Sequence, residues 1–76
     1  MPHIEIKCFP GRTKEQKTLC AEKITEVVAD TMGCSTSSVS VTIKEVAEAD
    51  WKAEVWDKSI VPDEQYMFKK PGYSCE

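Results

Sequence analysis

Two short stretches of alternating apolar and polar residues flank one long helical pattern, and this order constrains the fold more than any other feature. Residues 2–9 alternate apolar with polar side chains, as expected of a strand that buries one face. Residues 39–44 repeat that alternation. Between them, residues 13–32 carry apolar side chains at spacings of three and four, which is typical of an amphipathic helix. This order predicts a βαβ unit with parallel strands and a right-handed crossover.

Local signals mark the two ends of the helix. Thr13 is a suitable N-cap, and Gln16 stands where a capping box places Glu or Gln. Gly33 follows the last helical residue and readily takes the left-handed backbone conformation that ends many helices. We therefore expect the helix over residues 13–32, covering the apolar face of both strands.

The rest of the chain has to complete this unit, because one helix on two strands is not a stable domain by itself. The 76 residues are short enough for a single α+β domain, residues 1–76. Residues 47–60 have a mixed pattern of apolar and polar side chains, from which no helix or strand is predicted. Pro62 and the acidic residues after it predict a short C-terminal helix that includes Tyr66, Met67 and Phe68. A second subunit is the other means of completing the domain.

Charge and hydropathy exclude several kinds of partner. The formal net charge of −3 disfavours nucleic acid, because proteins that bind it present a basic face. No apolar run approaches the roughly 20 residues that a membrane-spanning helix needs, so no membrane partner is expected. The chain opens with a strand pattern and not with a recognisable leader. We therefore expect the protein in the cytoplasm.

The four cysteines indicate neither a disulfide framework nor a metal site. No two of them have Cys-x-x-Cys spacing, and only one histidine accompanies them, so ligands for zinc are scarce. Cys8 and Cys20 fall on the apolar faces of their elements, which predicts small buried hydrophobic residues in a reducing compartment. No metal or other cofactor is expected. A redox or metal protein is a weaker alternative, which thiol titration and metal analysis would test.

Pro2 is the residue that most suggests chemistry. Removal of Met1 would leave it as a free secondary amine at the start of a strand. An α-amino group has a reference pKa of about 8, and a nearby cation or partial burial disfavours its charged form. Lys7 and Arg12 are near in sequence and could supply such a cation. A neutral amine can take a proton from a carbon next to a carbonyl and return it elsewhere.

Two simpler interpretations of this end of the chain stay open. Proline at the second position is common and needs no catalytic reason. If Met1 stays attached, the Pro2 nitrogen is an amide and has no basic lone pair. His3 lies on the polar face of the predicted strand, where a hydrogen-bonded surface histidine is the simpler interpretation.

The residues resemble those of the 4-oxalocrotonate tautomerase family. Three segments carry the resemblance: the opening MPHIEI, the helix start GRTKEQK at residues 11–17, and SVSV at residues 38–41. The likeness covers residues 2 to about 51, and the tail KKPGYS at residues 69–74 is similar to the short bacterial PptA-type branch. That branch is described as dimeric. The resemblance implies two protomers that pair into a four-stranded sheet with the helices on one face.

The resemblance also implies roles for individual residues. Pro2 matches the family's general base for keto–enol tautomerisation, which needs no cofactor. Arg12 matches an arginine that binds the substrate carboxylate, and Trp51 falls where an aromatic residue lines the pocket. Ser40 stands where the family has a second arginine that activates the substrate carbonyl. A hydroxyl lacks the permanent charge and bidentate geometry of a guanidinium, so we expect a phenylpyruvate-like 2-oxo acid and not a dicarboxylate. Lys7 is a further candidate for lowering the pKa of the amine.

Two rival functions stay open. Related members dehalogenate or decarboxylate with the same proline, and those reactions need the protonated amine, so their pH–rate profiles run opposite to that of a tautomerase. Ser40 also favours a non-catalytic dimeric binding protein, because a fold does not guarantee its chemistry. Unchanged behaviour of a Pro2→Ala variant would support that second alternative.

Overall fold

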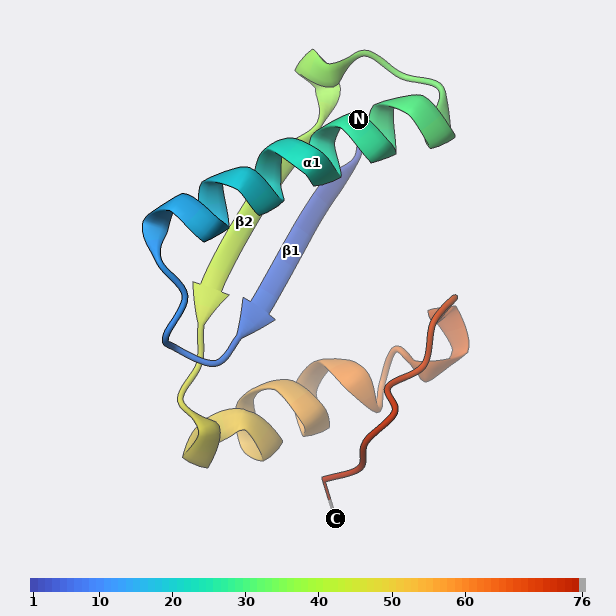
Figure 1. Cartoon of the computed structure of the whole chain (residues 1–76). Coiled ribbons are helices and arrows are strands. Elements are labelled where there is room, and N and C mark those ends of the chain that lie inside the picture. Colours follow the sequence, from blue (N-terminus) through green and yellow to red (C-terminus); the bar gives the residue numbers. More distant parts are fainter. Residues whose placement is uncertain (76) are drawn as a thin grey trace. The chain divides into compact units, whose positions relative to one another are not determined.

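The computed structural model of the chain describes residues 1–75, and its first part is the predicted βαβ unit. Strand β1 (His3–Cys8) leads into helix α1 (Lys14–Met32), and a short 3₁₀ helix, η1 (Thr36–Ser38), precedes strand β2 (Ser40–Glu45). The two strands pair in parallel, and α1 covers one face of the sheet (Figure 1). The predicted fold class is confirmed for this unit. The chain forms two compact parts, Met1–Glu45 and the chain from Val46 onward.

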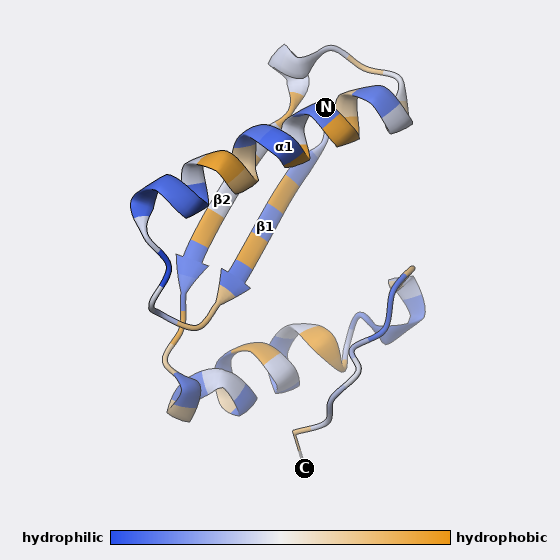
Figure 2. Cartoon of the chain, in the orientation of Figure 1, coloured by the Kyte–Doolittle hydropathy of each residue, from blue (hydrophilic) through white to orange (hydrophobic). Residues whose placement is uncertain are grey.

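Alternating side chains produce one apolar and one polar face of the sheet, as predicted. Ile4 and Ile6 are half-buried, whereas His3 and Glu5 are exposed. Figure 2 shows the alternation along both strands. His3 pairs with Ser40 in the parallel register, so like faces of β1 and β2 coincide. A shift of one residue would turn every apolar side chain to the wrong face.

Both predicted ends of α1 are present. The Thr13 hydroxyl accepts from the Gln16 backbone N–H at 3.1 Å, and the Gln16 side chain accepts from the Thr13 N–H at 2.8 Å, which completes a capping box. Gly33 ends the helix with a φ of 68°, a left-handed conformation in which a side chain at Cβ would be strained. The helix therefore begins and ends where local side-chain chemistry favours it.

Replacing Thr13 with alanine is expected to destabilise the protein by about 1 kcal/mol, because the Gln16 N–H then has no side-chain acceptor. Urea unfolding at fixed protein concentration measures this change. Thr18→Ala, at an exposed position within the same helix, is the matched control. Equal stability of the two variants would contradict a capping role for Thr13.

Few apolar side chains are fully buried by one copy of the chain. Among residues 1–75 the hydrophobic core is Val55 alone, which is 5% exposed. Leu19 and Val27 of α1 remain 55% and 59% exposed. Cys20 is also exposed, so its predicted burial is wrong, while Cys8 is half-buried. The physical reason is that the sheet is too narrow. Two strands about 4.8 Å apart cannot cover the whole apolar stripe of a helix about 10 Å across.

The part from Val46 onward is mostly helical. A 3₁₀ helix, η2 (Glu48–Asp50), leads into the π-helix η3 (Lys52–Ile60), where the sequence pattern assigned no element. The wide turn of the π-helix places side chains five apart beside each other, and Lys52 Nζ lies 3.0 Å from an oxygen of Asp57. Val55 is the buried residue of this part.

The predicted C-terminal helix is shorter than expected. It consists of one 3₁₀ turn, η4 (Glu64–Tyr66), and the backbone of Met67 is extended, with φ −79° and ψ 127°. Met67 and Phe68 therefore lie outside the helix, which corrects the prediction for these two residues. Phe68 is fully exposed, so burial of its side chain does not favour a longer helix. Within residues 1–75, no helix combines the length and the apolar character that crossing a membrane requires.

Candidate active site at the amino end of the sheet

Residues 2 and 40 lie beside each other where the parallel sheet begins. The Ser40 backbone N–H donates to the Pro2 carbonyl oxygen at 3.1 Å, and His3 is the register partner of Ser40. Pro2 is half-buried and precedes β1, a position where its missing N–H costs no ladder hydrogen bond. The register thus brings together the predicted base and Ser40, which the sequence separates by 38 positions.

A side-chain hydrogen bond joins His3 and Ser40 next to Pro2. The His3 Nδ1 and Ser40 Oγ atoms are 2.7 Å apart, and both residues are exposed. The sequence predicted that both side chains lie on the polar face of the sheet, which is confirmed. It did not indicate the bond, because the pairing depends on the register of two strands and not on either strand alone.

Ion pairs occupy the polar face further along the strands. Glu5 lies 4.0 Å from the Lys7 ammonium and 3.7 Å from that of Lys44. Lys7 follows Pro2 by five residues, or about 16 Å of extended strand. The structure therefore does not bring Lys7 close to the Pro2 nitrogen of its own chain. Thr42, between Ser40 and Lys44, has a hydroxyl that is shielded from solvent and has no hydrogen-bond partner.

Arg12 lies at the opposite end of the unit from Pro2. It follows the carboxyl end of β1, and six strand residues separate this end from Pro2, which is about 20 Å. One Arg12 Nη donates to the Phe9 carbonyl at 3.2 Å, and the side chain remains exposed. It also lines a hollow of about 310 Å³ that includes Cys8 and Cys20. Within one chain, Arg12 and Pro2 are not brought together.

Trp51 belongs to the second part of the chain, where it meets Tyr73. Its indole Nε1 donates to the Tyr73 hydroxyl at 3.1 Å. The rings of Trp56 and Tyr73 lie 5.4 Å apart at an angle of 48°, a tilted arrangement typical of aromatic pairs. Tyr73 thus contacts both tryptophans. The sequence identified Trp51 as a candidate and gave Tyr73 no role, because 22 positions separate the two residues.

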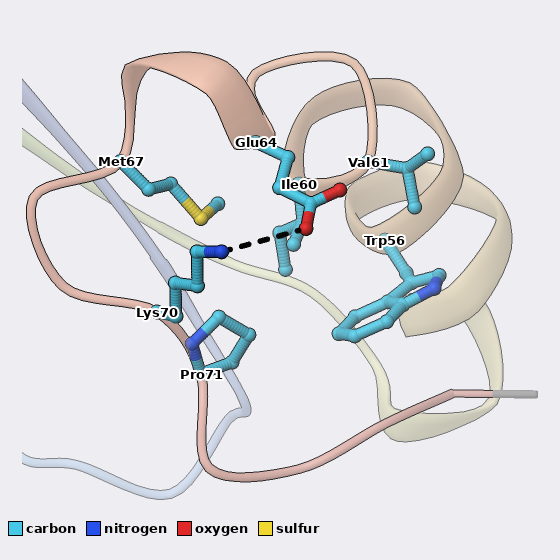
Figure 3. Close-up of a pocket in the computed structure, with 7 residues that line it drawn as sticks. All are labelled: Trp56, Ile60, Val61, Glu64, Met67, Lys70 and Pro71. Atoms are coloured by element: carbon cyan, nitrogen blue, oxygen red, sulfur yellow. Dashed lines mark ion pairs between the residues drawn. The ribbon is translucent and has the colours of Figure 1, made fainter.

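A small pocket also lies within this second part (Figure 3). Its volume is about 110 Å³, and its lining residues are Trp56, Ile60, Val61, Glu64, Met67, Lys70 and Pro71. The Lys70 ammonium lies 3.8 Å from a Glu64 carboxylate oxygen, so the cation of this pocket is already paired with an anion. The pocket can hold a small apolar group, and its paired lysine is a poor partner for a second carboxylate.

Potential metal ligands are scattered through the described part of the chain. Residues 1–75 contain no group of three or more His, Cys, Asp or Glu side chains that could hold a metal ion. All four cysteines are free thiols.

Comparisons with known proteins give one consistent result. The family profile described as Tautomerase enzyme matches residues 2–58. Tautomerase PptA of Enterobacter sp. (strain 638) is 49% identical over 97% of this chain and 99% of its own length, and that of Klebsiella pneumoniae (strain 342) is 48% identical over the same shares. Among solved structures, YwhB, a homologue of 4-oxalocrotonate tautomerase, is 40% identical with a TM-score of 0.60, covering 62% of this chain and 77% of that one.

Proposed function

Because the chain belongs to the tautomerase family and is thus an isomerase, we propose that it interconverts keto and enol forms of 2-oxo acids without a cofactor. Pro2 is the general base in this proposal. The observation that carries it is the position of Pro2 at the amino end of β1, hydrogen-bonded through its carbonyl to Ser40 and beside the exposed His3–Ser40 pair. The proposed base and an exposed hydroxyl donor therefore belong to neighbouring residues at the start of the two paired strands.

The reaction requires the free amine of Pro2. Met1 has to be removed first, because an amide nitrogen has no lone pair for a proton. The neutral amine then takes a proton from the carbon next to the substrate carbonyl, and negative charge develops on the carbonyl oxygen. Hydrogen-bond donors aimed at that oxygen lower the barrier, because they stabilise the charge as it forms.

Arg12 is proposed to bind the substrate carboxylate from a partner subunit. The distance of about 20 Å along β1 prevents Arg12 from acting at Pro2 of the same chain. A two-fold axis perpendicular to the strands reverses the strand direction of the second copy. It can then place Arg12 of the partner subunit at the amino end of this chain's sheet.

A homodimer also accounts for the surface that one copy leaves uncovered. Both edges of a two-stranded sheet are open to further pairing, and Leu19 and Val27 of α1 are largely exposed. Pairing of two copies edge to edge would give a four-stranded sheet with both helices on one face. The single domain of residues 1–76 would in that case be completed by its partner.

The remaining candidates concern substrate choice. Trp51 is proposed to line the substrate pocket and favour an aromatic side chain, and Ser40 to contact the carbonyl oxygen. Lys7 is proposed to act on the site of another subunit or on a distant part of the substrate, because about 16 Å of strand separates it from Pro2 of its own chain. A phenylpyruvate-like acid fits one carboxylate-binding arginine and an aromatic wall.

No nucleic acid or membrane partner is proposed, and we place the protein in the cytoplasm.

The test is the ketonisation rate of enol-phenylpyruvate, measured on protein whose intact mass shows that Met1 is gone. We expect a rate well above that of buffer, with kcat/KM rising with pH until the amine is fully neutral. A profile that falls over that range, together with turnover of halogenated or β-oxo acids, would instead support the dehalogenase or decarboxylase alternative. No turnover of any of these acids would support the binding protein that Ser40 allows.

A further inference from the structure

The hydrogen bond between the His3 and Ser40 side chains lies on the surface, so packing of a core does not explain it. Its 2.7 Å separation is short, yet both side chains are exposed. An exposed hydrogen bond adds little to stability, because water replaces each partner when the bond breaks. The backbone ladder already holds the two strands in register. What distinguishes this bond is its place next to Pro2, whose carbonyl accepts from Ser40.

Resting on the proposed function, we propose that His3 is a positioning residue that directs the Ser40 hydroxyl toward the carbonyl oxygen of the substrate. In this proposal the His3 ring takes the tautomer that carries its proton on Nδ1, so that this N–H donates to Ser40 Oγ across the 2.7 Å separation. A serine hydroxyl has one hydrogen and two lone pairs, so accepting from His3 leaves its hydrogen free to donate elsewhere. The exposed Ser40 side chain is then free to donate to a bound substrate, and its backbone is hydrogen-bonded to Pro2.

In the proposed reaction one proton leaves carbon and one is added to oxygen. The Pro2 nitrogen takes a proton from the carbon next to the carbonyl, the electron pair of that C–H bond forms a C=C bond, and the carbonyl π pair moves to oxygen. The Ser40 hydroxyl donates a hydrogen bond to this oxygen as its charge develops. The oxygen then takes a proton from water, and the Pro2 ammonium releases one to water. The product is the enol, and neither atoms nor charge are gained or lost. Ketonisation runs these steps in reverse: the neutral Pro2 amine gains, through water, the proton that the enol hydroxyl releases, and it delivers a proton to carbon.

His3 makes a serine a better donor in two ways. A free hydroxyl rotates, whereas one that accepts from the His3 ring has a preferred direction. Hydrogen bonds in a chain also polarise one another, so donation by His3 strengthens donation by Ser40. The neighbouring charge on this face is Glu5, whose carboxylate is paired with Lys7 and Lys44. In the structure, the hydrogen-bond partner of the His3 ring is therefore Ser40.

The experiment compares variants of His3 and Ser40 in the ketonisation of enol-phenylpyruvate. We expect kcat to fall about 100-fold in Ser40→Ala, as for the loss of one oxyanion donor, and about 10-fold in His3→Ala, since the hydroxyl remains but is not directed. KM should change little in either variant. The double variant should be no slower than Ser40→Ala, because residues that act as a unit are not additive.

His3→Asn tests whether Ser40 needs a hydrogen-bond donor at the place of Nδ1 or only the bulk of an imidazole ring. Its amide nitrogen occupies nearly the place of the imidazole Nδ1 and can donate to Ser40, so we expect kcat within about threefold of the original protein. Lys44→Gln, on the same face of the sheet and without a bond to Ser40, is the matched control and should leave kcat unchanged. Circular dichroism and sedimentation should show the same fold and assembly for all variants.

The outcomes separate this inference from the proposed function. Full activity of His3→Ala, in a protein that loses activity on Pro2→Ala, would overturn the role of His3 and leave the tautomerase intact. Equal losses in His3→Ala and His3→Asn would also overturn it, because a donor at Nδ1 would then not matter. A protein without turnover above buffer would overturn both. Rescue by asparagine, together with a double variant no slower than Ser40→Ala, supports the proposal.

Discussion

Replacing Pro2 with alanine is expected to lower kcat/KM for enol-phenylpyruvate ketonisation about 100-fold or more, the usual contribution of a positioned general base. The proline ring restricts rotation about the N–Cα bond, so the lone pair of the amine has a nearly fixed direction. Alanine leaves a primary amine that rotates freely. Pro2 makes its ladder contact through its carbonyl, which alanine retains, so the fold should be unaffected.

The measurement needs two controls. Pro62→Ala changes an exposed proline in the second part of the chain, outside the residues proposed for the site, and should leave the rate unchanged. Intact mass gives the fraction of chains without Met1, and the rate should rise in proportion to that fraction. A Pro2→Ala variant with the original rate would refute the general-base role, and activity in chains that retain Met1 would do the same.

Mixing two inactive variants, Pro2→Ala and Arg12→Ala, is expected to restore about a quarter of the original activity. In a two-fold dimer half of the randomly mixed dimers are heterodimers, and each has one site with both original residues. This result follows if Pro2 acts with Arg12 of the partner subunit, because the other site of the heterodimer loses both residues. The geometry supports it, since β1 separates the two residues of one chain by about 20 Å.

The activity of the mixture is compared with the activity of each variant measured alone. Arg12→Ala should lower kcat/KM by itself about 100-fold, in line with the loss of a charged hydrogen bond to a carboxylate, about 1.5–3 kcal/mol. Its fold should persist, since the Arg12 side chain is exposed and donates to a single carbonyl. No recovery after subunit exchange, in a mixture that sedimentation shows to be dimeric, would place both residues in one chain. A monomeric protein would rule out the shared site altogether.

Much of the βαβ unit was predictable because its signals are local. The alternation in β1 and β2, the capping box of Thr13 and Gln16 and the left-handed Gly33 each depend on residues close in sequence. The second part was less predictable for the opposite reason. The π-helix Lys52–Ile60 has a mixed apolar pattern, and the helix predicted through Phe68 stops at Tyr66, beyond which the backbone of Met67 is extended.

The sequence by itself determined the strand–helix–strand order, the polar face on which His3 and Ser40 lie, and the resemblance that marks Pro2. Only the tertiary structure decided which of these residues meet. Parallel pairing places His3 beside Ser40 at one end of the sheet and leaves Arg12 at the other. The physical reason is that faces follow from the two-residue period of a strand, whereas neighbours across a sheet follow from strand direction and register, which no short segment of sequence encodes.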